Sequence, residues 1–254
     1  STKERNMKGY GFVGFFDILG YKEIIENNDI DRVSSIISDI LESLVKRTSD
    51  AVLSKLKSED AKKLFSESIS NIESRLISDS IILAFPLVEG KKTDSLAFQS
   101  LRFLSYASQL LRLSFDQGLP LRGAIDYGEF FLSGQCFAGK PLIDCYKLGG
   151  KLDLAGCAIT DSCTKYVLHT IKPRPLIADV LNRLIVPYLI PFNDATCQHM
   201  RILNWYLPWQ DWGDPYDNFR SHTISAFQAH NKDIGPAVVS KVTNTEIMLH
   251  KLNT

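Results

Sequence analysis

The stretch Gly14-Phe15-Phe16-Asp17-Ile18-Leu19-Gly20-Tyr21 (GFFDILGY) places one acid in a strongly apolar run, shortly before a glycine. Residues 10–17 have the length and the aromatic content of a β-strand, and Gly20 ends the run. An aspartate at this place either interrupts a buried strand or lies at its end, where it can hold a charged group. The remainder of the sequence decides between these alternatives.

The composition predicts a globular protein without a global electric field. The chain has 254 residues, 44% of them hydrophobic, which suffices for one large domain or for a domain with an appended lobe. Its 29 basic residues balance its 29 acidic ones, so we expect no nucleic-acid partner and no membrane partner. Neither a bilayer-spanning apolar run nor a signal-peptide pattern is found.

Cysteine usage indicates a reducing compartment. The cysteines are odd in number and show no C-x-x-C spacing: Cys136, Cys145, Cys157, Cys163 and Cys197. We therefore expect reduced thiols in a cytoplasmic protein, without a zinc site.

Hydrophobic periodicity predicts an α+β fold. The expected strands are residues 10–17, a hairpin of 72–78 and 80–85 around Asp79, a second hairpin of 121–127 and 129–132 turning at Gly128, and 156–160. The expected helices are residues 21–47, 94–116 and 141–154, with a helix or loop of low burial at 48–71. The order is β-α-β-β-α-β with a further strand, which is the ferredoxin-like arrangement.

The hydrophobic periodicity of the sequence becomes less regular after residue 170. Prolines interrupt the periodicity, at Pro173, Pro175, Pro187, Pro191 and Pro208, and a last amphipathic helix is expected at roughly 236–252. We predict a main domain over residues 8–170 and, over 171–254, a proline-rich, partly helical extension packed on it.

Two aspartates are expected to meet at one end of the sheet. Asp17 ends the first strand and Asp79 lies in the first hairpin turn, and these are neighbours in a ferredoxin-like sheet. Two like charges repel unless a cation lies between them, and oxygen ligands suit Mg²⁺ or Mn²⁺. The N–H groups of the segment Ile18-Leu19-Gly20-Tyr21, at the start of the next helix, would form a phosphate cradle. The alternative is that Asp17 caps that helix and Asp79 is a turn residue.

Four segments in order resemble the class III nucleotide cyclase catalytic domain: GFFDILGY, SDSIILAF, LRGAIDYGEFF and PLIDCYKLG, over roughly residues 8–165. The resemblance implies that Asp17 and Asp79, with the backbone carbonyl of Ile18, bind two Mg²⁺ or Mn²⁺ ions per site. It also implies a head-to-tail homodimer in which each subunit completes the pocket of the other.

Departures from the family pattern concern the base and the transition state. Arg75 stands where adenylate cyclases carry a lysine and guanylate cyclases a glutamate, and Cys136 falls near the second base-reading position. An ungapped match puts Ile143 in place of the family's asparagine and Lys147 in place of its arginine, whereas a shifted match puts Lys147 and Lys151 in those roles. With its C-terminal extension, the chain is most similar to the pyrimidine cyclases of bacterial Pycsar anti-phage defence.

This resemblance implies that UTP or CTP, with UTP preferred, is converted to the 3′,5′-cyclic monophosphate, which a separate effector protein senses. An arginine supplies donors for the carbonyl groups of either pyrimidine, although it also suits guanine, so pyrimidine preference rests mostly on the resemblance. Lys147 or Lys151 from the partner subunit would neutralise charge at the α-phosphate. Arg122 either reaches the phosphates or forms a structural ion pair.

Two further expectations concern charged side chains. We expect neither Asp17 nor Asp79 to neutralise a buried cation, so that removing either relieves repulsion in the metal-free protein. Arg75 and Asp79 are separated by an even number of residues and are expected to share the substrate face, unless Arg75 merely neutralises Glu73.

The alternative functions are an adenylate or guanylate cyclase and a degenerate, non-catalytic nucleotide-binding module.

Overall fold

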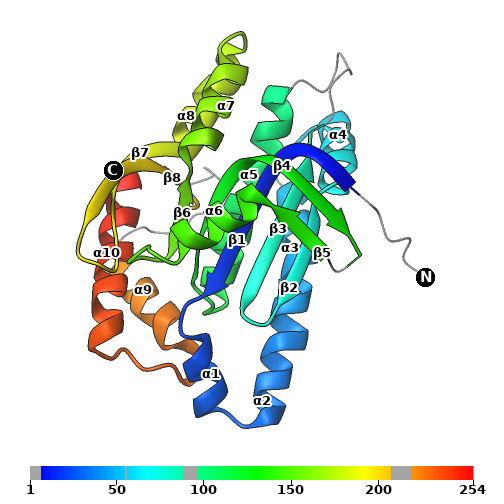
Figure 1. Ribbon diagram of the computed structural model, residues 1–254. Helices are drawn as coiled ribbons and strands as arrows, with labels where there is room; N and C mark the ends of the chain where they lie inside the picture. Colours follow the sequence, from blue (N-terminus) through cyan, green and yellow to red (C-terminus); the bar gives the residue numbers. More distant parts are fainter. Residues whose placement is uncertain (1–6, 55, 88–95, 135, 207–218, 254) are drawn as a thin grey trace.

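A single large sheet organises the protein. The computed structural model describes residues 7–54, 56–87, 96–134, 136–206 and 219–253 (Figure 1). The strands run in the spatial order β2 (Glu73–Ile77), β3 (Ser80–Pro86), β1 (Met7–Ile18), β4 (Leu121–Ser133), β6 (Gly156–Ile159), β8 (Cys197–Leu203) and β7 (Ile185–Pro191). The short strand β5 (Cys136–Gly139) pairs with β4.

The first four strands confirm the predicted α+β, ferredoxin-like arrangement. β1 lies between β3 and β4 and is antiparallel to both, and β2 pairs antiparallel with β3. Helical segments connect β1 to β2 and β3 to β4, the latter through α5 (Leu96–Asp116). Residues 94 and 95 of that predicted helix lie outside the described residues. Because successive side chains of β1 point to opposite faces, the two faces of the sheet bury different sets of them.

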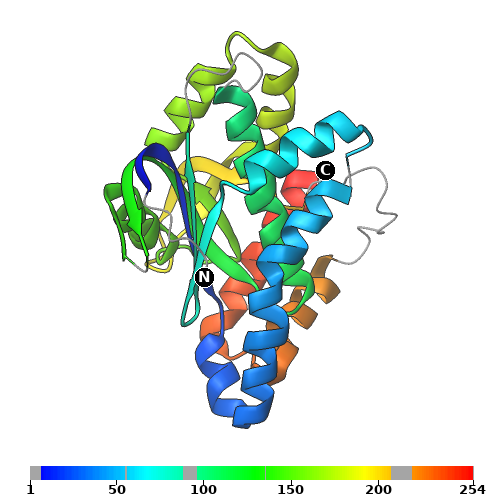
Figure 2. The same cartoon turned by 90° about the vertical axis from the view of Figure 1, so that its right-hand side faces the viewer.

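Helices cover the two faces of the sheet unequally. Figure 2 shows the long helices α3 (Ser43–Ser54) and α5 on one side and α6 (Lys140–Gly149) on the other. Phe12 faces α5, where its ring stacks on Phe103 with centroids 5.2 Å apart. Phe15 faces α6, where its ring meets Tyr146 edge-on at 5.4 Å. Asp17, an even number of residues from Phe15, therefore lies on the α6 face.

The prediction of one continuous helix over residues 21–47 is wrong. The chain forms α1 (Tyr21–Asn27), α2 (Ile30–Ser35), a π-helical segment over Ile36–Glu42 and then α3, and α4 (Glu59–Ile69) follows. The break has a local cause, because Asp29 caps α2 by accepting a 2.8 Å hydrogen bond from the Arg32 N–H. Ile30, which lies within the predicted helix, is 78% exposed.

The predicted turn at Gly128 is also wrong. β4 runs straight through this residue, which pairs with Gly11 of β1, and the chain turns instead at Gly134, whose φ is 54°. Gly128 serves close packing, because a Cβ there would lie 2.8 Å from Cγ of Pro141 at the start of α6. Similarly, α6 ends at Gly149 rather than at residue 154, and a Cβ on Gly149 would lie 2.9 Å from Cα of Gly123.

Residues beyond 170 supply strands as well as helices. After α7 (Asp161–Ile171) come α8 (Pro175–Leu184), β7, β8, α9 (Phe219–Gln228), a 3₁₀ turn (Ala229–Asn231) and α10 (Pro236–Asn253). β8 pairs with β6, so the C-terminal segments continue the same sheet, and Pro208 lies outside the described residues. Among the described helices we find none that combines the length and apolarity needed to cross a membrane.

Candidate functional site

Asp17 lies at the end of β1, directly opposite Ser80 of β3 and Arg122 of β4. Its carboxylate accepts hydrogen bonds from Nε of Arg122 at 3.1 and 3.2 Å and from Nη2 at 2.9 Å. The two side chains are 23% and 19% exposed, so the pair is largely withdrawn from water. The expectation that Asp17 neutralises no buried cation is therefore wrong, because the Arg122 side chain is largely buried, and Arg122 forms the ion pair that was its alternative role.

Asp79 lies beside this pair. It occupies the β2–β3 turn with Ser78, whose φ of 56° is left-handed. The Asp79 carbonyl accepts a 3.0 Å hydrogen bond from the Ile18 N–H, which fastens the turn to the end of β1. Its carboxylate accepts from the Ser80 hydroxyl at 3.3 Å. The two aspartates thus lie at the same end of the sheet, and only Asp17 has an arginine partner among the described contacts.

The donor set at this end suits a hard divalent cation. It offers the carboxylate oxygens of Asp17 and Asp79 and the adjacent carbonyl of Ile18, and oxygen ligands are those that Mg²⁺ and Mn²⁺ prefer. Within the described residues there is no group of three or more His, Cys, Asp and Glu side chains that could hold a metal. A cation here would thus depend on two carboxylates, and it would compete with Arg122 for Asp17.

Two backbone N–H groups of the segment after Asp17 already have hydrogen-bond acceptors within the chain. The Leu19 N–H donates to the Pro120 carbonyl at 2.9 Å, and the Ile18 N–H is held by Asp79. The candidate phosphate donors are accordingly the N–H groups of Gly20 and Tyr21, at the start of α1. Gly20 has a φ of 79°, in the left-handed region that favours glycine.

The side chain of Lys232 packs against the segment at Gly20, and the sequence did not predict this contact. A Cβ on Gly20 would lie 2.6 Å from Cδ of Lys232. The lysine is 4% exposed, and its Nζ donates to the carbonyl groups of Gly118 at 2.7 Å and Ala226 at 3.2 Å. Burial lowers the pKa of Lys232 to about 8. A lysine in an irregular, polar segment is ordinarily a surface residue, so no pattern indicated its burial.

Arg75 lies on the same face of the sheet as Asp17. Asp17 pairs with Ser80, Ser80 with Ile77, and Arg75 precedes Ile77 by an even step. The expectation that strand alternation relates Arg75 to Asp79 is wrong, because Asp79 lies in the turn and not in β2.

The Arg75 guanidinium is held from two sides. It contacts Glu73 at 3.2 Å and the carbonyl groups of Ser74 at 2.8 Å and Gly134 at 3.3 Å. Its buried Nε–H has no hydrogen-bond partner among the described residues. The contact with Gly134 brings Arg75 to the β4–β5 turn, two residues before the exposed Cys136.

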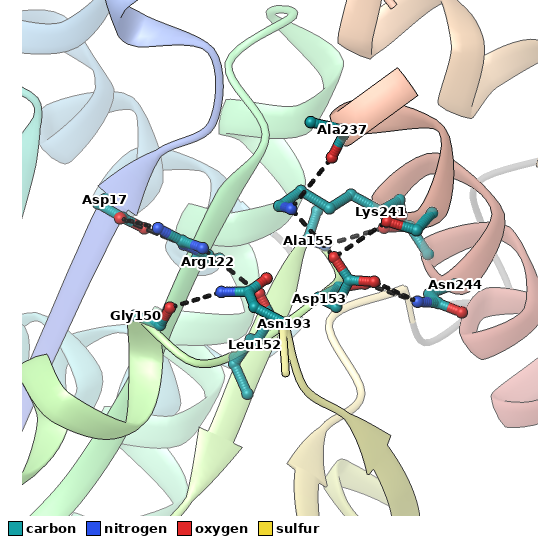
Figure 3. Close-up of polar contacts among 12 residues, drawn as sticks. Asp17, Arg122, Gly150, Leu152, Asp153, Ala155, Asn193, Ala237, Lys241 and Asn244 are labelled. Atoms are coloured by element: carbon teal, nitrogen blue, oxygen red, sulfur yellow. Dashed lines mark hydrogen bonds and ion pairs between the residues drawn. The ribbon is translucent and has the colours of Figure 1, made fainter. Parts of the chain in front are cut away.

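The two candidate lysines differ in setting. Lys147 is exposed on the outer side of α6, near Ile143 and Tyr146, which are 53% and 62% exposed. Lys151 is exposed in the turn that follows the helix, and the next residue, Leu152, accepts a 3.4 Å hydrogen bond from Nη1 of Arg122 through its carbonyl. Figure 3 shows Arg122 between Asp17 and this turn. The described chain therefore links the turn of Lys151, but not Lys147, to Asp17 by a polar contact.

Comparisons with known proteins return solved structures only. No protein-family model matches the chain, and no curated protein matches it. The catalytic core of a rhodopsin-guanylyl cyclase with converted specificity, in complex with ATPαS, matches at 12% identity with a TM-score of 0.48, over 80% of this chain and 98% of that one. A class III adenylyl cyclase-like ATP-binding protein from Pseudomonas aeruginosa matches at 14% identity with a TM-score of 0.41, over 64% of this chain and 35% of that one. We therefore base function on the residues of the site.

Proposed function

We propose that this protein is a pyrimidine nucleotide cyclase, which converts UTP, or CTP less readily, to the 3′,5′-cyclic monophosphate and pyrophosphate. The observation that carries the proposal is the position of Asp17 and Asp79 at one sheet end, joined by the hydrogen bond between Ile18 N–H and the Asp79 carbonyl. Two carboxylates and a carbonyl would suffice as protein ligands for the metal ions, because the triphosphate would supply further oxygen ligands.

The residues of the chain would bind and orient the substrate for in-line attack of the ribose 3′-hydroxyl on the α-phosphorus. Two Mg²⁺ or Mn²⁺ ions held by Asp17, Asp79 and the Ile18 carbonyl would lower the pKa of that hydroxyl and offset phosphate charge. Gly20 and Tyr21 would donate N–H groups to the phosphates. Arg122 keeps the Asp17 carboxylate in place before substrate binds.

Arg75 is the residue we assign to the base. Its guanidinium lies on the Asp17 face of the sheet, and its N–H groups would donate to a pyrimidine carbonyl oxygen. Cys136 lies close by, at the start of β5 and two residues after Gly134, whose carbonyl Arg75 contacts. This arrangement supports a pocket that donates hydrogen bonds to the carbonyl groups of a base. Adenine would also require an acceptor for its amino group.

A head-to-tail homodimer would complete each site. The α6 side of the sheet exposes apolar side chains, including Ile143, Tyr146 and the strand residue Ile77, which is 54% exposed. A second copy of the chain would cover them and bring its Lys147 or Lys151 to the α-phosphate. The cyclic product would act as a second messenger for a separate effector in anti-phage defence. We place the reaction in the cytoplasm, since all five cysteines are free.

A non-catalytic nucleotide-binding module is the second candidate. Two points favour it: in the ungapped match Ile143 stands where the family carries an asparagine, and the Arg122 guanidinium occupies both oxygens of Asp17. Such a module would bind a triphosphate without turning it over.

The experiment that separates these functions is a product screen. The protein is incubated with Mn²⁺ and each of ATP, GTP, CTP and UTP in turn, and the products are resolved by chromatography. We expect cyclic UMP as the main product and cyclic CMP as the lesser one. Cyclic AMP or cyclic GMP as the main product would refute pyrimidine specificity, and triphosphate binding without any cyclic product would favour the non-catalytic module.

A further inference from the structure

The loop between α6 and β6, residues 150–155, carries Lys151 and is held by the C-terminal segments on two sides. This loop contains neither a regular helix nor a strand pair, yet most of its backbone polar groups have partners. Figure 3 shows the loop between Asn193 on one side and Lys241 and Asn244 on the other. We refer to these contacts together as the loop clamp.

The first side of the clamp is the turn between β7 and β8. The Asn193 side chain donates from Nδ2 to the Gly150 carbonyl at 2.8 Å, and its backbone N–H donates to the Lys151 carbonyl at 2.8 Å. The Asp153 N–H in turn donates to the Pro191 carbonyl at 3.0 Å. One turn of the extension therefore fixes the backbone immediately before and after the Lys151 Cα, while the lysine side chain stays exposed.

The second side is α10. Lys241 Nζ lies 3.0 Å from Oδ1 of Asp153, and Asn244 Nδ2 donates to the Asp153 carbonyl at 2.9 Å and to its Oδ2 at 3.0 Å. The fully buried Thr245 accepts from the Ala155 N–H at 2.8 Å. The Asp153 and Lys241 side chains are only 14% and 19% exposed, so this ion pair is poorly screened.

The inner edge of the loop faces the candidate site. The Leu152 carbonyl accepts from Arg122 at 3.4 Å, and Arg122 holds Asp17. Contacts thus run from Asp17 through Arg122 to the loop, and from the loop to α10. Among the elements that lie after residue 170 in the sequence, the loop clamp and Lys232 both reach the candidate site.

We propose that the C-terminal extension positions the 150–155 loop for the cyclase reaction, with Asn193 and Asn244 as its positioning residues. This inference rests on the proposed function, and it selects Lys151 over Lys147 as the lysine that acts at the α-phosphate. The physical reason is preorganisation: a loop whose backbone is already ordered presents its lysine without an entropic cost at the moment of reaction. The backbone is fixed and the side chain is free to reach a phosphate across a subunit interface.

The test uses the full chain with Asn193→Ala, Asn244→Ala and, as the matched control on α10, Thr243→Ala, whose side chain is exposed. The first readout is limited trypsin cleavage after Lys151, which requires local opening of the loop. Asn193→Ala removes one neutral side-chain hydrogen bond, and Asn244→Ala removes one to a carbonyl and one to the Asp153 carboxylate, so we expect cleavage about two- to tenfold faster than in the wild type. Thr243→Ala is expected to be cleaved at the wild-type rate.

The second readout is the kinetics of cyclic nucleotide formation. Both clamp variants should lower kcat about two- to tenfold with an unchanged KM for the triphosphate, because the metal and base residues are untouched. A merely structural role would instead lower the amount of active protein and leave kcat per active site unchanged, so active sites are titrated with bound triphosphate. Lys151→Ala should lower kcat more than Lys147→Ala.

Each contrary result has one meaning. Cleavage after Lys151 at the wild-type rate in both clamp variants would show that the clamp does not order the loop. Faster cleavage with an unchanged kcat would overturn the positioning role and leave the proposed function standing. A wild-type protein without cyclase activity would refute the proposed function, and the positioning role with it, whereas cleavage would still decide whether the clamp exists.

Discussion

Removing Asp17 should destabilise the metal-free protein, whereas removing Asp79 should not. Asp17→Ala leaves the Arg122 guanidinium, 19% exposed, without the carboxylate that accepts its bonds at 2.9, 3.1 and 3.2 Å. A hydrogen bond to a charged group contributes about 1.5–3 kcal/mol, and the remaining exposure of this pair brings the expected loss to about 1–2 kcal/mol. Among the described residues, the Asp79 carboxylate has only a 3.3 Å contact from Ser80, so Asp79→Ala should change stability by less than about 0.5 kcal/mol.

Urea unfolding in the presence of a chelator measures both effects. A double-mutant cycle with Arg122→Ala isolates the pair, and we expect a coupling of about 1–2 kcal/mol between residues 17 and 122. The reasoning is refuted if Asp17→Ala is as stable as the wild type in chelator, or if the coupling is near zero. Repeating the experiment with Mn²⁺ adds the metal: at a concentration about 100 times the Kd, the wild type should gain about 2.7 kcal/mol, and both aspartate variants should lose this gain.

Three further predictions concern the base, the dimer and the buried lysine. Arg75→Ala should lose pyrimidine preference or pyrimidine turnover while still binding Mn²⁺, which the product screen and a metal titration measure; unchanged rates with all four triphosphates would remove Arg75 from the pocket. Asp17→Ala and Lys151→Ala should each be inactive and should regain activity when mixed, because one pocket of the heterodimer is intact; inactivity of a verified heterodimer would place the site within one chain. The folded pKa of Lys232, about 8, is below its ordinary value of 10.5, so the folded state binds fewer protons than the unfolded state between these values and its stability rises with pH there. Between pH 7 and pH 9 the wild type should therefore gain about 1 kcal/mol relative to Lys232→Met in urea unfolding, and parallel stability curves would show that the lysine is not buried in its charged form.

Features set by local sequence could be predicted from it. Hydrophobic periodicity, with glycine or proline at the ends, predicts three elements: β1, the β2–β3 hairpin and the helix over Leu96–Asp116. The position of Asp17 and Asp79 at one sheet end follows from the ferredoxin-like order alone. The turn at Gly128 could not be excluded, because a glycine needed for close packing against Pro141 looks the same in a sequence as a glycine needed for a turn.

Features set by distant contacts could not be predicted. Arg122 is 105 residues from Asp17 in the sequence, and the two meet only because the β1–β4 register places them opposite each other. A shift of that register by one residue would turn Arg122 to the other face. Burial of Lys232 under Gly20, and the hold of Asn193 and Asn244 on the 150–155 loop, likewise depend on segments that fold back from the end of the chain.

The most direct test of the central claim is the turnover of UTP by the wild type, Asp17→Asn and Asp79→Asn side by side with Mn²⁺. These substitutions keep the size of each side chain and remove only its charge. We predict that the wild type releases cyclic UMP and pyrophosphate in equal amounts, and that each variant loses at least about a hundredfold in rate while remaining folded. Near-wild-type turnover by either variant would contradict a two-carboxylate metal site at this end of the sheet.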